Sequence, residues 1–428
     1  MIQEAEYKKR RDRLASKLSK NSLAVVFSAD HKTRSNDTEY PFRQNSNFYY
    51  LSGFLEDKSC LVFVKTKTAV RTILFVRKKD KTQELWNGKR LGKKEAKKRF
   101  LVDEVYEYED LNAMIKEFAP EANVLHYDFN EQDSKVKLLK KYAKNTKLYK
   151  NIATPIGKMR LIKSDSEISL IKKALSITKE AHHRAMRMSS EVKYEYELQA
   201  EIEYVFKKNG AYSDAYTSIV ACANAANTLH YVSNDKELVD GKLILIDAGC
   251  EYEYYASDVT RSIPVSGKFT EAQKELYEMV LGVELAIIDM IKPNVKRSDL
   301  QKKSEELLCK GMIELGVLKG DYKKLLKNKA HKKYYPHGIG HWMGLDVHDQ
   351  CPYKDEKGEE IPLKAGMVMT IEPGLYIDEK DKTAPKKYRG IGIRIEDDVL
   401  VTPEGRENLS LSIAKTIEEI QNVTVRNK

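Results

Sequence analysis

The chain of 428 residues lacks any long hydrophobic run. Its apolar stretches are short pieces such as Leu23–Phe27, far below the roughly 18 apolar residues that a membrane-spanning helix needs. The N-terminus, MIQEAEYKKRRDRL, is charged from its fourth residue and lacks the apolar centre of a secretory signal. These absences predict a soluble protein with no membrane partner, and a cytoplasmic location is the default expectation.

Cysteine is scarce as well. The chain has five cysteines: Cys60, Cys222, Cys250, Cys309 and Cys351. Their number is odd and no two of them form a CxxC pair, which disfavours both a disulfide framework and a thiolate zinc site. We expect reduced thiols in a reducing compartment, most of them packing residues.

The excess of positive charge is confined to the N-terminal part of the chain. Residues 1–155 contain 33 basic and 21 acidic side chains, whereas residues 156–428 contain 42 and 43. The formal net charge of +11 could indicate a nucleic-acid partner, which would bind with a steep salt dependence. Because the charge lies in lysine-rich stretches such as Lys93–Arg99 and Lys135–Lys150, we interpret it as a solvated face and expect no nucleic-acid partner.

The length favours two or three domains. The first 155 residues combine a charged helix, about Glu4–Lys20, with short β-type runs, and this mixture predicts an N-terminal α/β domain. The β-type runs are Leu23–Phe27, Cys60–Val64, Thr72–Val76 and Val124–Tyr127. The small, uncharged stretch at residues 151–155 interrupts a lysine-rich helix, so we interpret it as a linker and place the domain boundary there.

Residues 156–428 contain two successive halves of helices followed by strands. Ser164 and Glu167 form a capping-box pattern at the start of a long helix, and a second helix is expected at about residues 191–208. Strand-like runs follow at 217–222, 243–247 and 255–264. The same order then repeats, with helices at 271–291 and 298–315 and strands at 367–372, 375–377 and 391–402. The duplication predicts an α+β domain with a site between its halves.

Four acidic residues lie in or at the ends of apolar strands: Asp247, Asp258, Glu372 and Glu396. Strand alternation places Arg394 and Glu396 on the face opposite Ile393 and Ile395. Each carboxylate alone has an ordinary explanation, a salt bridge or a strand edge. A buried carboxylate is costly unless it is paired or bound to a metal. Together with His341, the four therefore predict a common metal site.

The segment PHGIGHWMGLDVHD contains His337, His341 and His348. The first two have the spacing of a helical zinc motif, but Gly338 and Gly340 disfavour a helix and no glutamate follows His337. Four carboxylates and one imidazole suit Mn²⁺, Mg²⁺, Fe²⁺ or Co²⁺ better than a thiolate zinc site does. Their four charges would neutralise two divalent ions, which can hold a bridging hydroxide and polarise a carbonyl for amide hydrolysis.

Four segments resemble the signature blocks of the pita-bread metallopeptidases: DAGCEYEYYASDVTRSIPVSGKFT, PHGIGHWMGLDVHD, TIEPGLYI and YRGIGIRIEDDVLVT. The resemblance covers essentially the whole chain and implies that residues 156–428 form a pita-bread catalytic domain. It implies five ligands for two divalent ions, with Mn²⁺ expected: Asp247, Asp258, His341, Glu372 and Glu396. Asp258 and Glu396 match the bridging positions, and Glu372 would also act as general base and acid.

Two N-terminal segments, YPFRQNSNFYYLSGF and ELWNGKRLG, resemble the aminopeptidase P family more closely than prolidases. That resemblance implies release of the N-terminal residue from peptides with proline in the second position, through the metal-bridging hydroxide. A prolidase, which cuts only Xaa-Pro dipeptides, is the alternative. A non-catalytic pita-bread binding module is a third possibility, disfavoured because all five ligand positions are present.

The same resemblance implies further site residues: His230, His337 and His348 around the scissile bond, Tyr376 and Arg394 at the substrate, and Trp86. Trp86 would reach the active site of a neighbouring subunit in a homo-oligomer, a dimer or tetramer. His337 and His348 could instead be structural, Arg394 could only orient Glu396, and Trp86 could be partly buried in its own domain. Residues 350–360, QCPYKDEKGEE, depart from the family pattern, which leaves the pocket details there open.

Overall fold

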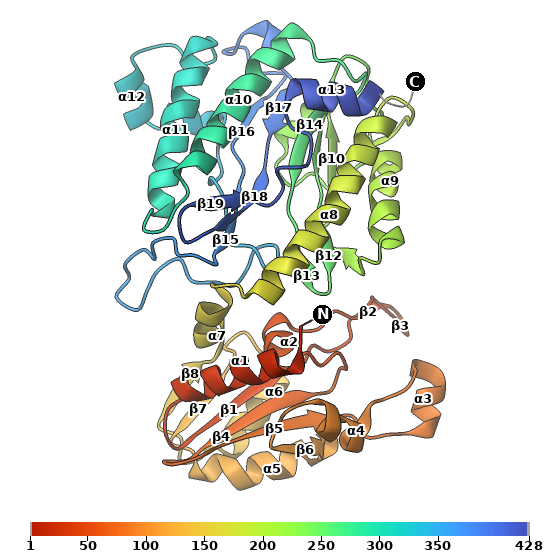
Figure 1. Cartoon of the computed structure of the whole chain (residues 1–428), viewed down its shortest axis with the longest axis vertical. Coiled ribbons are helices and arrows are strands. Elements are labelled where there is room, and N and C mark those ends of the chain that lie inside the picture. The colour runs from red at the N-terminus through yellow and green to blue at the C-terminus, as the bar shows by residue number, and fades with distance from the viewer. Residues whose placement is uncertain (1, 426–428) are drawn as a thin grey trace. The chain divides into compact units, whose positions relative to one another are not determined.

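The computed structural model of the chain describes residues 2–425 and divides into two compact units, Met1–Arg160 and Leu161–Lys428 (Figure 1). The boundary expected after residue 155 falls inside helix α7 (Ala153–Arg160), which belongs to the first unit. Pro155 lies in the first turn of this helix, where its missing N–H removes no helical hydrogen bond. The stretch interpreted as a linker therefore starts a helix.

The first unit contains a six-stranded mixed sheet in the order β6-β5-β4-β1-β7-β8. Its strands are β1 (Ser22–Phe27), β4 (Cys60–Lys65), β5 (Val70–Val76), β6 (Glu104–Glu107), β7 (Val124–Tyr127) and β8 (Leu148–Asn151). Strand β1 pairs antiparallel with β4 and parallel with β7, and all six of its residues are buried. The four apolar runs predicted as strands are confirmed as β1, β4, β5 and β7. Such runs are recognisable because a strand covered on both faces of a sheet is mostly apolar.

Helices and one small hairpin complete the first unit. They are α1 (Glu4–Lys17), α2 (Ser46–Ser52), α3 (Lys81–Asn87), α4 (Gly92–Arg99), α5 (Leu111–Phe118), α6 (Asp133–Tyr142) and the hairpin β2 (Thr33–Ser35) with β3 (Thr38–Glu39). The predicted charged helix corresponds to α1 and ends before Leu18, three residues earlier than expected.

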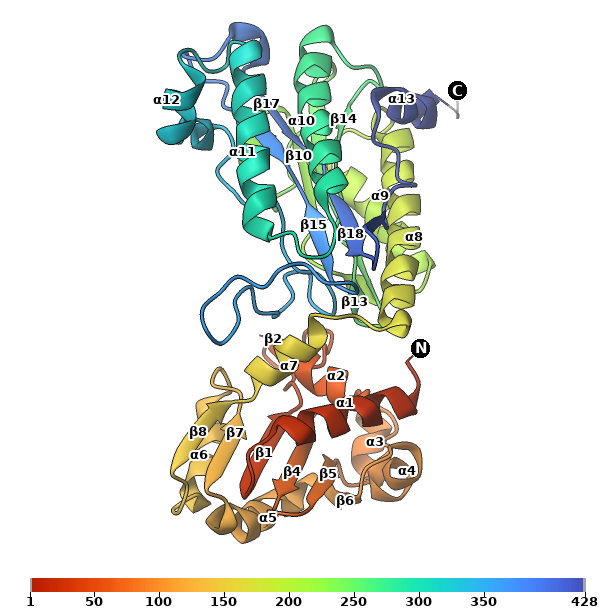
Figure 2. The ribbon, with the colours of Figure 1, turned by 60° about the vertical axis from the view of Figure 1, so that its left-hand side comes forward.

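The second unit contains four long helices: α8 (Asp165–Met188), α9 (Glu195–Lys208), α10 (Glu271–Met290) and α11 (Arg297–Glu314). The predicted capping box is present, since Ser164 Oγ accepts from Glu167 N–H and Ser164 N–H donates to the Glu167 carboxylate at 2.9 Å. Helix α8 packs on α9 and α10 packs on α11, and both pairs lie outside the strands in Figures 1 and 2. Two short helices are α12 (Tyr322–Lys327) and α13 (Ile417–Val425).

The strands of the second unit form small antiparallel sheets. The first half contributes β10 (Ile219–Cys222), β11 (Leu243–Asp247) and β14 (Thr260–Pro264), with β9 (Ser213–Asp214), β12 (Cys250–Tyr252) and β13 (Tyr255–Ala256) in a separate sheet. The second half contributes β15 (Val368–Ile371), β16 (Gly374–Ile377), β17 (Ile391–Arg394), β18 (Asp397–Val401) and β19 (Arg406–Asn408). The predicted repetition of helices followed by strands is confirmed.

Two predicted strands are each divided in two. Residues 255–264 form β13 and β14, which belong to different sheets, and residues 391–402 form β17 and β18. Residues 391–402 were expected to be continuous, but β17 pairs with β16, β18 pairs with β15, and a break at residues 395–396 separates them. Ile395 N–H donates to Pro373 O at 3.3 Å and Glu396 N–H to Thr260 O at 3.1 Å, so the chain changes partners at the break. Local sequence alternation carries no information about which strands will be neighbours.

Among the described residues, no helix is long and apolar enough to cross a membrane. All five cysteines are buried thiols outside disulfide bonds, in agreement with their prediction as packing residues.

Candidate metal centre and active site

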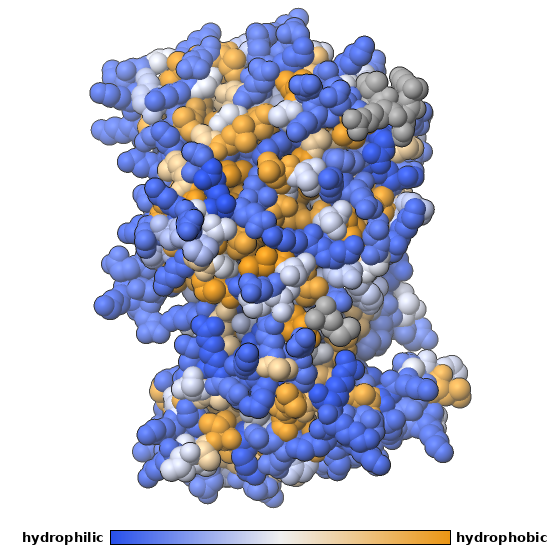
Figure 3. Space-filling model, viewed as in Figure 1, coloured by the Kyte–Doolittle hydropathy of each residue, from blue (hydrophilic) through white to orange (hydrophobic). Residues whose placement is uncertain are grey.

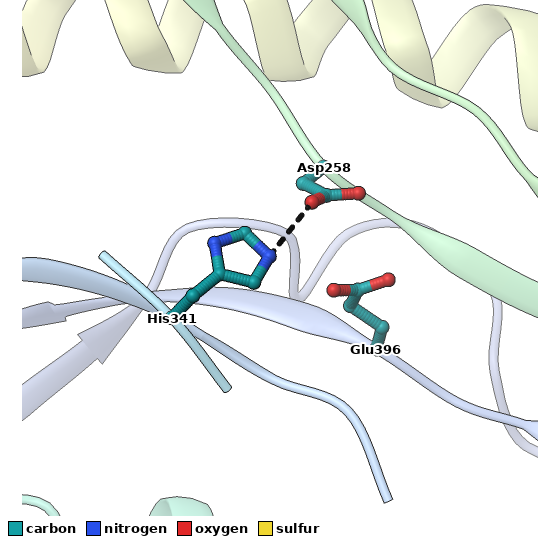
Figure 4. A group of neighbouring side chains, drawn as sticks. All are labelled: Asp258, His341 and Glu396. Carbon is teal, nitrogen blue, oxygen red and sulfur yellow. Dashed lines mark ion pairs between the residues drawn. The ribbon is translucent and has the colours of Figure 1, made fainter. Parts of the chain in front are cut away.

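Asp258, His341 and Glu396 lie together between the strands of the two halves (Figure 4). Each offers one ligand atom, and these atoms all lie within 4.8 Å of one another. His341 Nε2 is 3.3 Å from Asp258 Oδ2. Asp258 and Glu396 are only 5% and 2% exposed, and buried carboxylates this close need a positive charge. An oxygen-rich set with one imidazole fits a hard divalent cation.

Glu372 and Asp247 complete the predicted ligand set at the same cavity. Glu372 Oε1 lies 3.6 Å from His341 Nε2. The Asp247 carboxylate has two other partners, because Arg394 Nη2 donates to Oδ2 and the Tyr216 hydroxyl to Oδ1, both at 2.6 Å. All five predicted ligands therefore line one cavity, and three of them form the tight group.

A close approach between a loop and β15 orients His341. A side chain on Gly340 would place its Cβ 1.9 Å from Thr370 O, so only glycine fits there. His341 N–H donates to Thr370 Oγ1 at 3.1 Å, and that hydroxyl donates to Glu372 Oε1 at 3.2 Å. His341 Nδ1 lies 3.1 Å from Trp342 O, which favours the tautomer with Nε2 free for a metal. Thr370 thus holds two of the predicted ligands.

Arg394, Tyr376 and His337 form a hydrogen-bonded chain beside the ligands. Arg394 Nη1 donates to the Tyr376 hydroxyl at 3.0 Å, and that hydroxyl lies 2.8 Å from His337 Nε2. Burial, and next the charge of Arg394, lower the pKa of His337 to about 3. The ring is therefore neutral, and its Nε2 can accept a hydrogen bond from the Tyr376 hydroxyl. Arg394 Nε also donates to Thr260 Oγ1 at 3.1 Å, and Thr260 Oγ1 donates to Glu396 Oε2 at 2.6 Å. Arg394 therefore orients Asp247 directly and Glu396 through Thr260.

The cavity above the ligands measures about 260 Å³. His230 and His348 line it and are exposed, and His348 packs edge-on to His341 with ring centroids 4.3 Å apart. The wall of the cavity also contains four apolar residues: Ile219, Leu229, Val232 and Val347. A concave site with a few convergent polar groups and an apolar wall is typical of a small-substrate pocket.

Models of two known families match the chain. The model described as metallopeptidase family M24 matches residues 169–403, and that of the aminopeptidase P N-terminal domain matches residues 7–126. The chain belongs to metallopeptidase family M24. The chain is 38% identical to a Xaa-Pro aminopeptidase of Haemophilus influenzae, over 98% of this chain and 96% of that relative.

Solved M24 structures agree with this fold over the whole chain. Aminopeptidase P from E. coli with the inhibitor Pro-Leu superimposes with a TM-score of 0.95 at 38% identity, covering 99% of this chain and 98% of that one. The zinc-substituted E. coli enzyme in complex with product superimposes equally well, with the same identity and coverage. The predicted fold class is confirmed: an N-terminal α/β domain and a C-terminal pita-bread domain.

The cluster of predicted ligands has strongly shifted pKa values. Burial raises the pKa of Glu372 to about 7, and burial together with Asp258 raises that of Glu396 well above its ordinary value. Burial alone would lower the pKa of His341, but the carboxylates of Asp258 and Glu372 outweigh it and raise this pKa to about 9. Such carboxylates ionise together only when added positive charge compensates them, which is what a bound divalent cation does.

Trp86 lies on α3 in the first unit and is 79% exposed, beside Leu85 at 83%. The alternative of a partly buried aromatic in its own domain is therefore wrong.

Residues 350–360 do not form a regular helix or strand. Tyr353 in this loop stacks on Trp342, next to His341, with ring centroids 5.5 Å apart.

Three residues that sequence reasoning missed hold side chains predicted as metal ligands: Tyr216, Thr260 and Thr370. Thr260 was accessible to prediction, since strand alternation places it on the same side as Asp258. Tyr216 precedes β10 in a loop and reaches Asp247 only through the fold, so no local signal marks it.

Proposed function

We propose that this chain is a metal-dependent Xaa-Pro aminopeptidase, which releases the N-terminal residue from peptides with proline in the second position. One observation carries the proposal: the five predicted ligands, His341 among them, and three further histidines line one cavity. The resemblance to Xaa-Pro aminopeptidases over nearly the full length of both chains supports it.

The proposed ligands of two divalent ions, with Mn²⁺ as the native metal, are Asp247, Asp258, His341, Glu372 and Glu396. Asp258 and Glu396 are assigned the bridging positions, and their burial beside a shared histidine supports this role. Two ions held by these residues would supply an activated water and would polarise the scissile carbonyl. The donor set favours a hard metal such as Mn²⁺.

Proton transfer is assigned to Glu372. Its carboxylate would take a proton from the attacking water and return it to the proline nitrogen, which must be protonated to leave as an amine. The Thr370 hydroxyl, 3.2 Å from Oε1, supports this role by fixing the carboxylate in the cavity. His337 lies on the side of the other carboxylate oxygen, with its Nδ1 3.7 Å from Glu372 Oε2.

Carbonyl and substrate binding are assigned to side chains of the cavity wall. Burial, followed by the charge of His341, lowers the pKa of His348, which favours a neutral imidazole that can donate to the developing oxyanion together with His230. Arg394 and Tyr376 would hold the peptide, with His337 oriented by Tyr376. A Xaa-Pro bond has no N–H, so its recognition depends on shape and on the carbonyl.

Comparing a Xaa-Pro dipeptide, a Xaa-Pro-Yaa tripeptide and a Xaa-Ala-Yaa control tests this assignment. We expect release of Xaa from the Xaa-Pro-Yaa tripeptide, no cleavage of the alanine control, and the highest rate with Mn²⁺ when Mn²⁺, Co²⁺ and Zn²⁺ are assayed in parallel. Cleavage confined to the dipeptide would identify a prolidase instead. Absence of cleavage with all three metals would favour the binding module.

A homo-oligomer, a dimer or tetramer, is proposed as the active form. The exposed Leu85 and Trp86 on α3 support it. Figure 3 shows some hydrophobic surface on the projection at the lower right, where Figure 1 places α3. We expect Trp86→Ala to lower kcat/KM roughly tenfold, as truncation of a central interface aromatic does. Thr82→Ala, at an exposed position of the same helix, is the matched control. A preparation that is monomeric by light scattering and fully active in the peptide assay would contradict the proposal.

A cytoplasmic location is proposed as well, supported by the five buried thiols, which form no disulfide bonds. Peptides are the proposed partners, and the basic N-terminal helices are assigned to the solvated surface.

A further inference from the structure

A buried ion-pair network lies directly behind the candidate metal ligands. Its members are almost inaccessible: Arg261, Glu284 and Asp397 at 0% and Lys415 at 4% exposure. Lys415 Nζ donates to both oxygens of Glu284, at 2.8 and 3.0 Å, and to Asp397 Oδ2 at 2.5 Å. Arg261 Nη2 pairs with Asp397 Oδ1 at 2.7 Å. Two positive and two negative charges balance, which buried ions require.

Arg261 uses every donor of its guanidinium. Besides the bond to Asp397, its nitrogens donate to four backbone carbonyls: Thr260 at 2.9 Å, Glu396 at 2.7 Å, Ala414 at 3.0 Å and Ile413 at 3.1 Å. A guanidinium offers five N–H groups in a fixed fork, and all five have a partner here. Arg261 therefore connects β14, the break between β17 and β18, and the C-terminal segment 413–415 in one rigid arrangement.

Arg261 contacts Glu396 at a point where the chain makes no strand pairing. Glu396 occupies the break between β17 and β18, so it lacks the ladder partners of a strand residue. Its N–H donates to Thr260 O, its carbonyl accepts from Arg261, and its carboxylate accepts from the Thr260 hydroxyl. Asp258 lies three residues before Arg261, at the entrance to the same strand β14. Arg261 thus contacts the backbone of Glu396 directly and, on the other side, the backbone of Thr260, two residues after Asp258.

We propose that Arg261 is a positioning residue that sets the separation of Asp258 and Glu396, and with it the affinity of the centre for divalent metal. The inference rests on the proposed role of these two carboxylates as bridging ligands. Arg261 touches the backbone of Glu396 and contacts neither carboxylate of the pair, so its effect is indirect. Lysine would keep the charge beside Asp397 but has only three donors on one nitrogen, too few to hold both halves and the C-terminal segment.

The test compares wild type, Arg261→Lys and Glu284→Gln as full-length proteins loaded with Mn²⁺. Each is equilibrated against a series of buffered free Mn²⁺ concentrations, and bound Mn²⁺ per chain is measured beside the midpoint of thermal unfolding. Glu284→Gln perturbs the same buried network but touches no ligand backbone. We expect Arg261→Lys to need roughly 10–100-fold more free Mn²⁺ for half occupancy, the range typical of residues that orient metal ligands. Glu284→Gln should keep the wild-type value while losing thermal stability.

The outcomes separate three cases. Wild-type half occupancy in Arg261→Lys, or losses of occupancy that track thermal stability equally in both variants, would overturn the positioning role alone. Wild-type protein without bound Mn²⁺ would overturn the proposed metal centre. If Arg261→Lys does not fold, the charge-balanced pair Arg261→Met with Asp397→Asn, which retains the Lys415–Glu284 pair, takes its place under the same criteria. With excess Mn²⁺, Arg261→Lys should recover kcat at an unchanged KM.

Discussion

Replacing Asp258 with asparagine is expected to lower kcat by about 10³-fold or more, equivalent to roughly 4 kcal/mol of activation free energy, while the chain remains folded. Asparagine has nearly the same volume, so the buried site at 5% exposure stays filled. The backbone contact is also kept, because Asp258 N–H donates to Asp398 Oδ2 at 3.0 Å whatever the side chain. What disappears is the charge of a carboxylate assigned to bridge two cations.

The same substitution tests the electrostatic argument. Asp258 is one of the charges that raise the pKa of Glu396, so its removal relieves repulsion in the metal-free chain. Initial rates with a Xaa-Pro-Yaa peptide at saturating Mn²⁺, together with thermal unfolding, measure both effects. Asp240→Asn, in an exposed loop of the same unit, is the matched control and should keep wild-type rates. Substantial residual turnover of Asp258→Asn would contradict the two-metal assignment.

Glu372→Gln is expected to lower kcat by roughly 10²–10⁴-fold, the range that loss of a general acid–base group produces. Glutamine keeps the shape and can still accept from the Thr370 hydroxyl, but it cannot take up a proton from water at neutral pH. Because Arg394 and Tyr376 remain, KM should change much less than kcat.

Metal content separates the two roles of Glu372. If bound Mn²⁺ per chain stays at the wild-type level while kcat falls, the loss belongs to proton transfer. Thr370→Val provides a graded comparison, since it removes only the hydroxyl that orients the carboxylate, and we expect a loss of about tenfold. A Glu372→Gln protein that retains most of its kcat at full metal occupancy would exclude glutamate as the base.

Much of this organisation was predictable because it depends on short-range rules. The runs that became β1, β4, β5 and β7 could be recognised as strands because a strand largely buried on both faces is mostly apolar. The capping box at Ser164 and Glu167 uses side chains three residues apart, and a local pattern suffices to recognise it. Carboxylates at the ends of apolar strands stand out because burying a charge without a partner is so costly.

Other features depend on contacts between distant residues. At the break at residues 395–396, the Ile395 N–H donates to Pro373 O and the Glu396 N–H to Thr260 O, so neighbouring residues bond to segments that are distant in the chain. The helix that replaces the expected linker at Pro155 shows that proline in a first turn and proline in a linker look alike locally.

By itself, the sequence determined the chemistry of the centre: which oxygen and nitrogen donors exist, that apolar strands carry them inward, and which family pattern they follow. Only the tertiary structure decided how those donors are held. Tyr216 on Asp247, Thr370 on His341, and Arg261 behind Glu396 are contacts across 29 to 135 positions of chain. Periodicity reports which side of its own strand a residue occupies, whereas these contacts depend on which strands become neighbours, and long-range packing alone decides that.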